Sequence, residues 1–175
     1  SNELVTEKIE ETSGSITFSL DDKFIYYSKL DEHHRPRKIF RHKLGTSARE
    51  DQLIFEEKSE AFTVGIGISS DEKYYFISTS DHNTSEQYYF DADEENPKPK
   101  IIKRRKKGII YSVNSWDGYF YNHTNENAED FKIEFCDDIS NQNWQSFIPA
   151  KDEVLIGGLV FLKNWIIRSE TSNAL

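Results

Sequence analysis

The stretch Ser69–Ser78, SSDEKYYFIS, sets a polar turn of Asp71, Glu72 and Lys73 directly before a run of aromatic and β-branched residues. The stretch Ser19–Ser28, SLDDKFIYYS, follows the same plan 50 positions earlier. Because a polar turn between short apolar runs is typical of a β-hairpin, each stretch predicts a hairpin turn and the strand after it. Their recurrence indicates an internal repeat.

Two later stretches extend this repeat. Asn114–Tyr121, NSWDGYFY, keeps both the turn and the aromatic run, and Gly158–Ile167, GLVFLKNWII, is a looser copy. The first aromatic residues after the four turns lie 50, 45 and 46 positions apart: Phe24, Tyr74, Tyr119 and Trp165. A period of this size is typical of stacked structural repeats.

Each turn follows a segment in which apolar residues alternate with polar or small ones. In the clearest segment, Phe62, Val64, Ile66 and Ile68 share one face. A period of two predicts a strand, since a helix would repeat every 3.6 residues. The strands predicted before the turns cover residues 16–20, 62–68, 109–113 and 154–161. The strands predicted after the turns cover residues 24–29, 74–80, 119–124 and 165–168.

A third and a fourth strand complete each unit. The third strands are predicted at residues 38–43, 87–91 and 131–135, and the fourth at residues 53–56, 101–103 and 144–148. Four antiparallel strands in each repeat of this length describe a propeller blade. We therefore predict an all-β fold, a β-propeller fragment of about three and a half four-stranded antiparallel blades. Gly65 and Gly67 suit an innermost strand, where a narrow axis leaves little room for side chains.

The repeat also predicts how the chain is divided. A lead-in at residues 1–14 precedes blades at 15–57, 62–104 and 108–149, and residues 153–170 form the first half of a further blade. Propellers close with about four to eight blades, so an open arc leaves two broad apolar faces uncovered. We expect a fragment of a longer protein that self-associates through its open blade faces.

Composition and charge exclude several classes of partner. The formal net charge is −9, and 14% of the residues are aromatic, which disordered chains lack. An acidic surface repels phosphate backbones and anionic lipids, so neither nucleic acid nor membrane is an expected partner. The lone Cys136 alternates with apolar strand residues, which predicts a small buried side chain and a reducing, cytoplasmic compartment. The chain begins without Met and without an apolar leader, which indicates a trimmed start.

We expect no catalytic residues, no cofactor-binding residues and no metal ligands in this chain. No two glycines are spaced as Gly-x-Ser-x-Gly requires, and Gly65-Ile66-Gly67 has no helix after it for a dinucleotide. The loop Asp91–Glu95 lacks the glycine and the final glutamate of a calcium loop. The histidines at positions 33, 34, 42 and 82 lack the cysteines of a zinc site and are predicted to be exposed loop residues.

The run 98–107, KPKIIKRRKK, is the one strongly basic segment. It falls on the predicted outermost strand of a blade, where lysines would prevent edge-to-edge pairing. We favour that function over nucleic-acid binding. Asn83 and Asn122 match the glycosylation pattern, but nothing in the sequence indicates secretion.

One longer motif is more specific than the blade repeat. Arg35–Thr46, RPRKIFRHKLGT, is followed by Asp51–Glu57, DQLIFEE, and later by Thr84–Glu86, TSE, and Thr124–Phe131, TNENAEDF. This pattern resembles the propeller of the prolyl oligopeptidase family of serine peptidases, in its oligopeptidase B branch. The resemblance extends over nearly the whole chain.

The resemblance implies a function for the parent protein. In this family a seven-bladed propeller caps an α/β-hydrolase domain that carries the Ser-Asp-His triad, and the cap admits short peptides while excluding folded proteins. Oligopeptidase B members cleave after Lys or Arg, and the residues that do so belong to the hydrolase domain. The implied partners are short basic peptides and the protein's own hydrolase domain, and this fragment alone should be inactive.

The alternative is a non-enzymatic propeller that serves as a scaffold for protein interactions. The parent reading frame distinguishes the two hypotheses. For the peptidase it continues for several hundred residues and contains Gly-x-Ser-x-Gly, whereas for the scaffold it ends after a few more blades. The acidity of the propeller could also concentrate cationic peptides near an entrance, an effect that salt would weaken.

Overall fold

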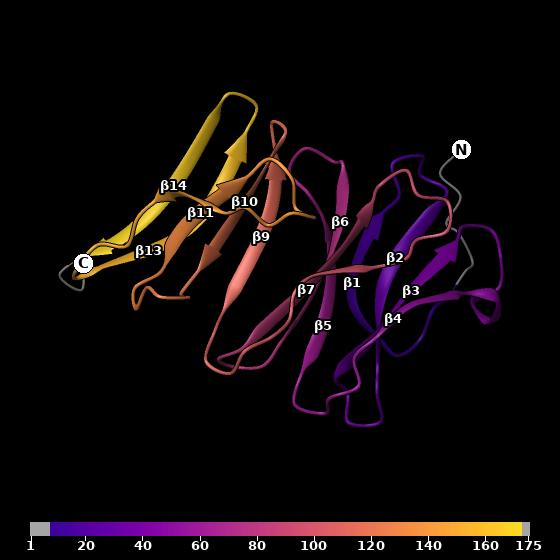
Figure 1. The fold of residues 1–175 in the computed structure, drawn as a ribbon. Helices are drawn as coiled ribbons and strands as arrows, with labels where there is room; N and C mark the ends of the chain where they lie inside the picture. The colour runs from indigo at the N-terminus through magenta and orange to yellow at the C-terminus, as the bar shows by residue number, and fades with distance from the viewer. Residues whose placement is uncertain (1–7, 173–175) are drawn as a thin grey trace.

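The computed structural model describes residues 8–172, which form four antiparallel sheets standing side by side in chain order (Figure 1). The first sheet contains β1 (Thr12–Phe18), β2 (Phe24–Leu30), β3 (Pro36–Lys43) and β4 (Gln52–Glu56). The second contains β5 (Thr63–Ile68), β6 (Tyr74–Ser80), β7 (Ser85–Asp91) and β8 (Lys100–Lys103). The third contains β9 (Tyr111–Trp116), β10 (Tyr119–Thr124), β11 (Lys132–Cys136) and β12 (Gln145–Ile148), and the fourth contains β13 (Val154–Leu162) and β14 (Trp165–Ser172).

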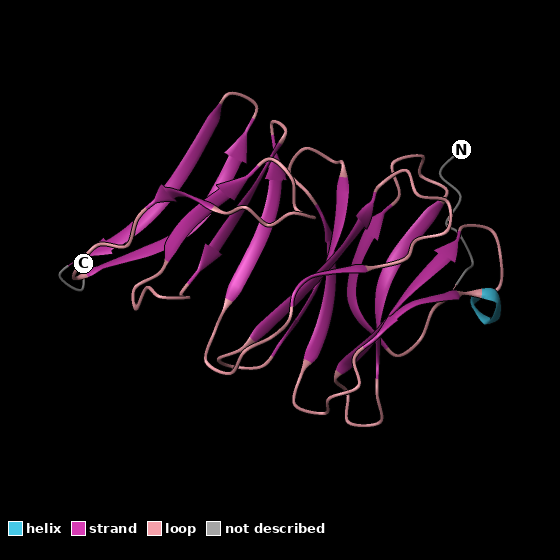
Figure 2. Ribbon diagram, in the orientation of Figure 1, coloured by secondary structure: helices cyan, strands magenta, loops and turns pink. Residues whose placement is uncertain are grey.

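Within each sheet, every strand pairs with the strand that follows it in sequence. Figure 2 shows strands and loops throughout, with a single short 3₁₀ helix at Ala48–Glu50 among the described residues. This architecture confirms the prediction of an all-β propeller fragment. The first strand differs most from its prediction, since β1 begins at Thr12 and ends at Phe18. Its end is set by the turn, in which the Ser19 N–H donates to the Phe24 carbonyl at 2.9 Å.

Two of the repeated turns share one geometry. In the two SxD turns the serine hydroxyl donates to the aspartate two positions on, at 2.7 Å for both Ser19–Asp21 and Ser69–Asp71. The tighter turn between β9 and β10 has φ = +50° at Asp117 and +81° at Gly118. Two successive residues with positive φ match the twist of a hairpin, so this turn agrees with the Asp-Gly signal in the sequence.

Aromatic side chains fill the space between the first and second sheets. Tyr26 from β2 lies 4.7 Å from Tyr75 of β6 between ring centroids, and Tyr75 lies 5.1 Å from Phe90 of β7. Ile39 and Ile77 are fully buried in the same cluster. This face of the second sheet is the one that the alternation of Val64 with its neighbours predicts.

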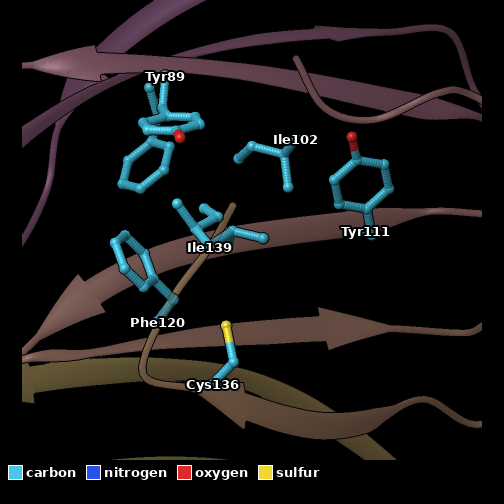
Figure 3. Close-up of a cluster of buried hydrophobic side chains, with 8 residues drawn as sticks. Tyr89, Ile102, Tyr111, Phe120, Cys136 and Ile139 are labelled. Atoms are coloured by element: carbon cyan, nitrogen blue, oxygen red, sulfur yellow. The ribbon is translucent and has the colours of Figure 1, made fainter. Parts of the chain in front are cut away.

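The opposite face of the second sheet packs against the third (Figure 3). Tyr89 and Ile102 meet Tyr111, Phe120 and Cys136, with Ile139 closing the cluster from the loop after β11. The third and fourth sheets are joined by a further cluster around Tyr121, Ile133 and Ile156. Because both faces of the two central sheets are covered, these four sheets form a continuous stack.

The two ends of the stack expose apolar side chains. On the fourth sheet Trp165 is 71% exposed, and Val160 and Ile167, which pair across the strands, are also exposed. On the first sheet Ile16 and Phe18 are about half exposed on the outer face. Each end therefore presents a surface of the kind that the interior sheets bury.

The predicted reason for Gly65 and Gly67, that a narrow axis leaves little room for side chains, is wrong. A Cβ atom added at either glycine would meet no atom within 4 Å. Crowding in this part of the stack therefore does not require a glycine at these positions.

Candidate functional site

The antiparallel order places the turns at two opposite edges of the stack. We call one edge the hairpin rim, formed by residues 19–23, 44–51, 69–73, 92–99, 117–118, 137–144 and 163–164. The other is the connection rim, formed by residues 31–35, 57–62, 81–84, 104–110, 125–131 and 149–153. Acidic residues outnumber basic ones more than two to one on the hairpin rim, and the two kinds are closer to balance on the connection rim. The acidity of the chain is therefore concentrated on one edge.

A buried ion-pair cluster lies at the connection rim, where the first sheet leads into the second. Arg105 Nη2 lies 2.7 Å from Glu57 Oε2 and 3.0 Å from Glu86 Oε1. The guanidinium also lies over the Phe62 ring, 4.0 Å from its centroid. The Glu57 and Glu86 side chains are 3% and 6% exposed, so one cation serves two buried carboxylates.

Hydrogen bonds keep both carboxylates ionised. Burial by itself would raise the pKa of Glu57, but donors on Thr79, Ser59 and Arg105 outweigh it and lower that pKa. Burial would likewise raise the pKa of Glu86. The Arg105 backbone N–H at 2.7 Å, the Tyr88 hydroxyl and the guanidinium lower it. The cluster is therefore a fixed, charged joint between sheets.

The function predicted for the basic run is wrong for Arg105. Only Lys100–Lys103 lie on the outer strand β8, where Lys103 pairs with Glu126 of the loop between β10 and β11. Arg105 lies in the connection to β9 and binds inward, while Arg104 on the same connection is exposed. The run therefore contributes an outer strand through Lys100–Lys103 and a contact between sheets through Arg105.

The second and third sheets are joined by polar contacts along their length. The Ser85 hydroxyl donates to the Tyr111 carbonyl at 2.8 Å and accepts the Tyr111 N–H at 2.7 Å. Gln87 Oε1 accepts the Val113 N–H at 2.6 Å. At the hairpin rim Ser115 donates its hydroxyl to Asp71 at 2.7 Å. These contacts fix the position of one sheet on the next.

His42 contradicts the prediction of an exposed loop histidine. It lies on β3 with its side chain 1% exposed, and its Nδ1 is 2.6 Å from Asp51 Oδ1. The other Asp51 oxygen accepts the Tyr27 hydroxyl at 2.7 Å. The strand pattern carried a signal for this burial. In the strand predicted at residues 38–43, His42 lies two positions after Phe40 and therefore on the same face as this apolar residue.

The other candidate residues do not form a chemical site. His33, His34 and His82 lie exposed in turns. Among residues 8–172, no three His, Cys, Asp or Glu side chains come together as a group that could hold a metal ion. Asn122 is buried on β10.

Cys136 is buried as predicted, and burial raises the pKa of its thiol to about 11. A neutral thiol of this kind is a packing residue rather than a nucleophile. No helix among the described residues is long and apolar enough to cross a membrane.

A concave feature of the hairpin rim lies between the first and second sheets. It is a pocket of about 590 Å³, lined by the β1–β2 turn, by Phe24, Tyr26 and Arg41, and by the loop 92–96. Arg41 Nη1 donates to the Glu95 carbonyl at 2.8 Å, and its guanidinium lies 4.6 Å from the Phe24 ring centroid. Sequence reasoning missed this pocket because its two walls are about 70 residues apart.

A stack of consecutive antiparallel sheets, each packed face to face on the next, defines the class of β-propeller domains. Residues 1–175 match the family described as "Prolyl oligopeptidase, N-terminal beta-propeller domain". The chain belongs to the prolyl oligopeptidase family, which confirms the resemblance seen in the sequence.

Two curated relatives illustrate the match. The chain is 32% identical over 170 residues to Protease 2 of Moraxella lacunata, covering 89% of this chain and 25% of that protein. It is 26% identical over 177 residues to dipeptidyl aminopeptidase BI of Pseudoxanthomonas mexicana, covering 99% of this chain and 24% of that protein. The chain thus spans about a quarter of these relatives, which are peptidases by name.

The solved structures agree on the fold. Oligopeptidase B from Trypanosoma brucei, in a closed form with covalently bound antipain, matches with a TM-score of 0.91 at 24% identity, over 97% of this chain and 25% of that one. Oligopeptidase B from Leishmania major matches with a TM-score of 0.91 at 21% identity, over 98% of this chain and 24% of that one.

Proposed function

We propose that this chain is part of the propeller that gates the active site of a serine oligopeptidase, and that the parent enzyme cleaves short peptides after Lys or Arg. The observation that carries the proposal is the family match over residues 1–175, together with 32% identity to a relative named Protease 2. We take the units 15–57, 62–104 and 108–149 as blades of this propeller and 153–170 as the first half of a further blade, after a lead-in at 1–14.

The structure supports a gating function through its rigidity. A cap that excludes folded proteins has to keep its sheets at fixed positions, and the buried Arg105 cluster and the Ser85–Tyr111 contacts do this at two successive joints. The acidic hairpin rim supports the proposal that the substrates are basic, because negative potential raises the local concentration of cationic peptides. Catalysis then belongs to the hydrolase domain of the parent, and the lone buried Cys136 suits a cytoplasmic enzyme.

The test is an assay of the full-length parent protein with matched peptides. We expect short reporter peptides ending in Arg or Lys to be cleaved, the same peptide ending in Pro to be cleaved far more slowly, and folded proteins to stay intact. The 175-residue chain alone should cleave none of them.

Each substrate tests one part of the proposal. Preference for the Pro peptide would contradict basic specificity, and digestion of a folded protein would contradict gating. If the parent protein cleaved no peptide at all, the non-enzymatic scaffold would replace the peptidase.

A further inference from the structure

The pocket on the hairpin rim is built by both of the first two sheets. Its lining includes the aromatic residues Phe24 and Tyr26 of β2, of which Tyr26 is almost fully buried. Its far wall is the loop 92–96, which is tied to the second sheet by the Ala92 N–H, a donor to the Lys73 carbonyl at 2.8 Å. Arg41 ties the same loop to the first sheet. The wall is therefore held from both sides before any ligand arrives.

The charged groups around the pocket are unequal. Its lining contains the carboxylates of Asp21, Asp93, Glu94 and Glu95, against the cations Lys23 and Arg41. Lys23 is already paired with Asp21 at 2.9 Å, so the remaining charges are the three carboxylates of the loop against the one guanidinium of Arg41. The lining therefore favours a cation.

One carboxylate oxygen in this wall lacks a partner. Glu94 Oε2 is buried, and no hydrogen-bond donor reaches it from the part of the chain that the structure describes. Leaving a buried acceptor unsatisfied is unfavourable, by about 1–3 kcal/mol in typical cases, so such a group calls for a donor from outside. A guanidinium or an ammonium group in the pocket would supply it once the Glu94 side chain turned toward the ligand, because this oxygen is closed to solvent in the structure.

The chain's own Arg41 shows that these surroundings suit a guanidinium. Its guanidinium is held by the Glu95 carbonyl at 2.8 Å, by Gln52 Oε1 at 2.7 Å and by the face of Phe24. An aromatic face and oxygen acceptors are the combination that binds guanidinium groups generally. The carboxylates of Asp93, Glu94 and Glu95 lie beside Arg41 in the lining of the same pocket.

We propose that this pocket binds the Lys or Arg side chain of a short basic peptide, as a docking site on the propeller that is separate from the chemistry of cleavage. The inference rests on the proposed function, since it places part of substrate recognition on this chain. A volume of about 590 Å³ suits one long side chain with its flanking backbone. A peptide held here at the rim of the cap would be enriched at the entrance of the enzyme.

The test is a titration of the 175-residue chain with acetyl-arginine amide, followed by NMR, with acetyl-norleucine amide as the uncharged probe of similar length. We expect saturable shifts at the backbone amides of Phe24, Ala92 and Glu94 with the arginine probe only. Glu94→Gln and Asp93→Asn should each weaken its binding, the former by about tenfold because it removes a charged hydrogen-bond acceptor.

Asp137→Asn is the matched control, because Asp137 is an exposed acid on the same rim outside the pocket. It should leave the affinity for the arginine probe within a factor of about two. Equal binding of the norleucine probe, shifts elsewhere on the chain, or an equal loss in Asp137→Asn would overturn the proposal. So would the absence of saturable binding to the wild type, a result that needs no variant to fold.

This titration and the peptidase assay fail separately. If the titration showed no binding in the pocket, the proposed specificity of the parent enzyme for basic residues would be unaffected, because the peptidase assay measures cleavage and not binding to this chain. A parent enzyme that cleaves after Pro would remove the proposed function while leaving the measured binding of the arginine probe intact.

Discussion

Arg105 is the residue on which the joint between the first two sheets depends. Its guanidinium pairs with both Glu57, in the connection that follows the first sheet, and Glu86, on the second sheet, and both carboxylates are almost fully buried. Removing one partner of a buried ion pair leaves an uncompensated charge, which is far more costly than the net contribution of the intact pair. Replacing Arg105 by an uncharged residue should therefore destabilise the protein.

We expect Arg105→Met to lower the free energy of unfolding by about 3 kcal/mol, since two buried carboxylates lose their cation and Arg105 itself is partly exposed. Urea denaturation measures the change. Arg104→Met is the matched control, because Arg104 is exposed on the same connection, and it should change stability by at most about 0.5 kcal/mol. Equal effects in the two variants would contradict the assignment of Arg105 as a joint.

The same cluster predicts the response to acid. Because the pKa values of Glu57 and Glu86 are lowered in the folded protein, the unfolded chain binds protons first as the pH falls. The stability that these groups contribute is complete above their ordinary pKa of 4.5, and it is lost as the pH falls through the lowered folded-state values.

Unfolding free energies measured from neutral pH downward should therefore decrease below about pH 4.5, and less steeply in Glu57→Gln than in the wild type. Glu129→Gln, at an exposed position, is the control and should keep the wild-type slope. An identical slope in Glu57→Gln and the wild type would show that this carboxylate does not titrate as described.

At the scale of the element, the strands follow from local sequence and the joints do not. Alternation of apolar residues and the recurring SxD and Asp-Gly turns predict strands and hairpins, because both depend on neighbours in sequence. The Arg105–Glu57 pair spans 48 residues, so no local pattern announces it. The strand pattern could have predicted that His42 is buried, but the polarity of the histidine side chain led to the prediction of an exposed loop residue.

Of the residues that carried the family resemblance, Thr84, Ser85 and Glu86 bind residues of the connection to the third sheet or of that sheet itself. Thr84 accepts the Gly108 N–H, Ser85 binds Tyr111, and Glu86 binds Arg105. His42 binds Asp51 in the first sheet. These positions stand out in the sequence because they hold polar groups that the fold buries.

Two glycines test the hairpin geometry. Gly118→Ala should lower stability by about 1 kcal/mol, because an alanine at φ = +81° is strained even though its Cβ has open space. Gly65→Ala, in a strand with equal space and no positive φ, should be neutral or raise stability by at most about 1 kcal/mol. Thermal or urea unfolding compares them, and destabilisation by Gly65→Ala would restore crowding as the reason for that glycine.

At the scale of the whole molecule, the two ends of the stack expose the apolar side chains that the interior joints bury. Burial of apolar surface contributes about 25 cal/mol per Å², so covering such a face is strongly favourable. We propose that the isolated chain self-associates through these faces, of which the fourth sheet is the more apolar. In a longer parent protein further sheets would cover them.

The variant Val160→Lys with Ile167→Glu tests this self-association. The two residues pair across β13 and β14, so the introduced charges can bind each other while making the face polar. Light scattering after size exclusion should show an increase in mass with concentration for the wild type and a monomer for the variant. Gln145→Lys, exposed on β12, should behave like the wild type. A monomeric wild type at all concentrations would remove the proposal.

The contacts between Ser85 and Tyr111 have a consequence for ring closure. Purely apolar faces can slide or rotate over each other at little cost, whereas paired donors and acceptors allow one angle between neighbouring sheets. In a closed circle these angles must add up to a full turn, so a small error at one joint would be repeated as a gap or an overlap at the seam. Buried polar pairs of this kind would therefore decide how many blades complete the circle.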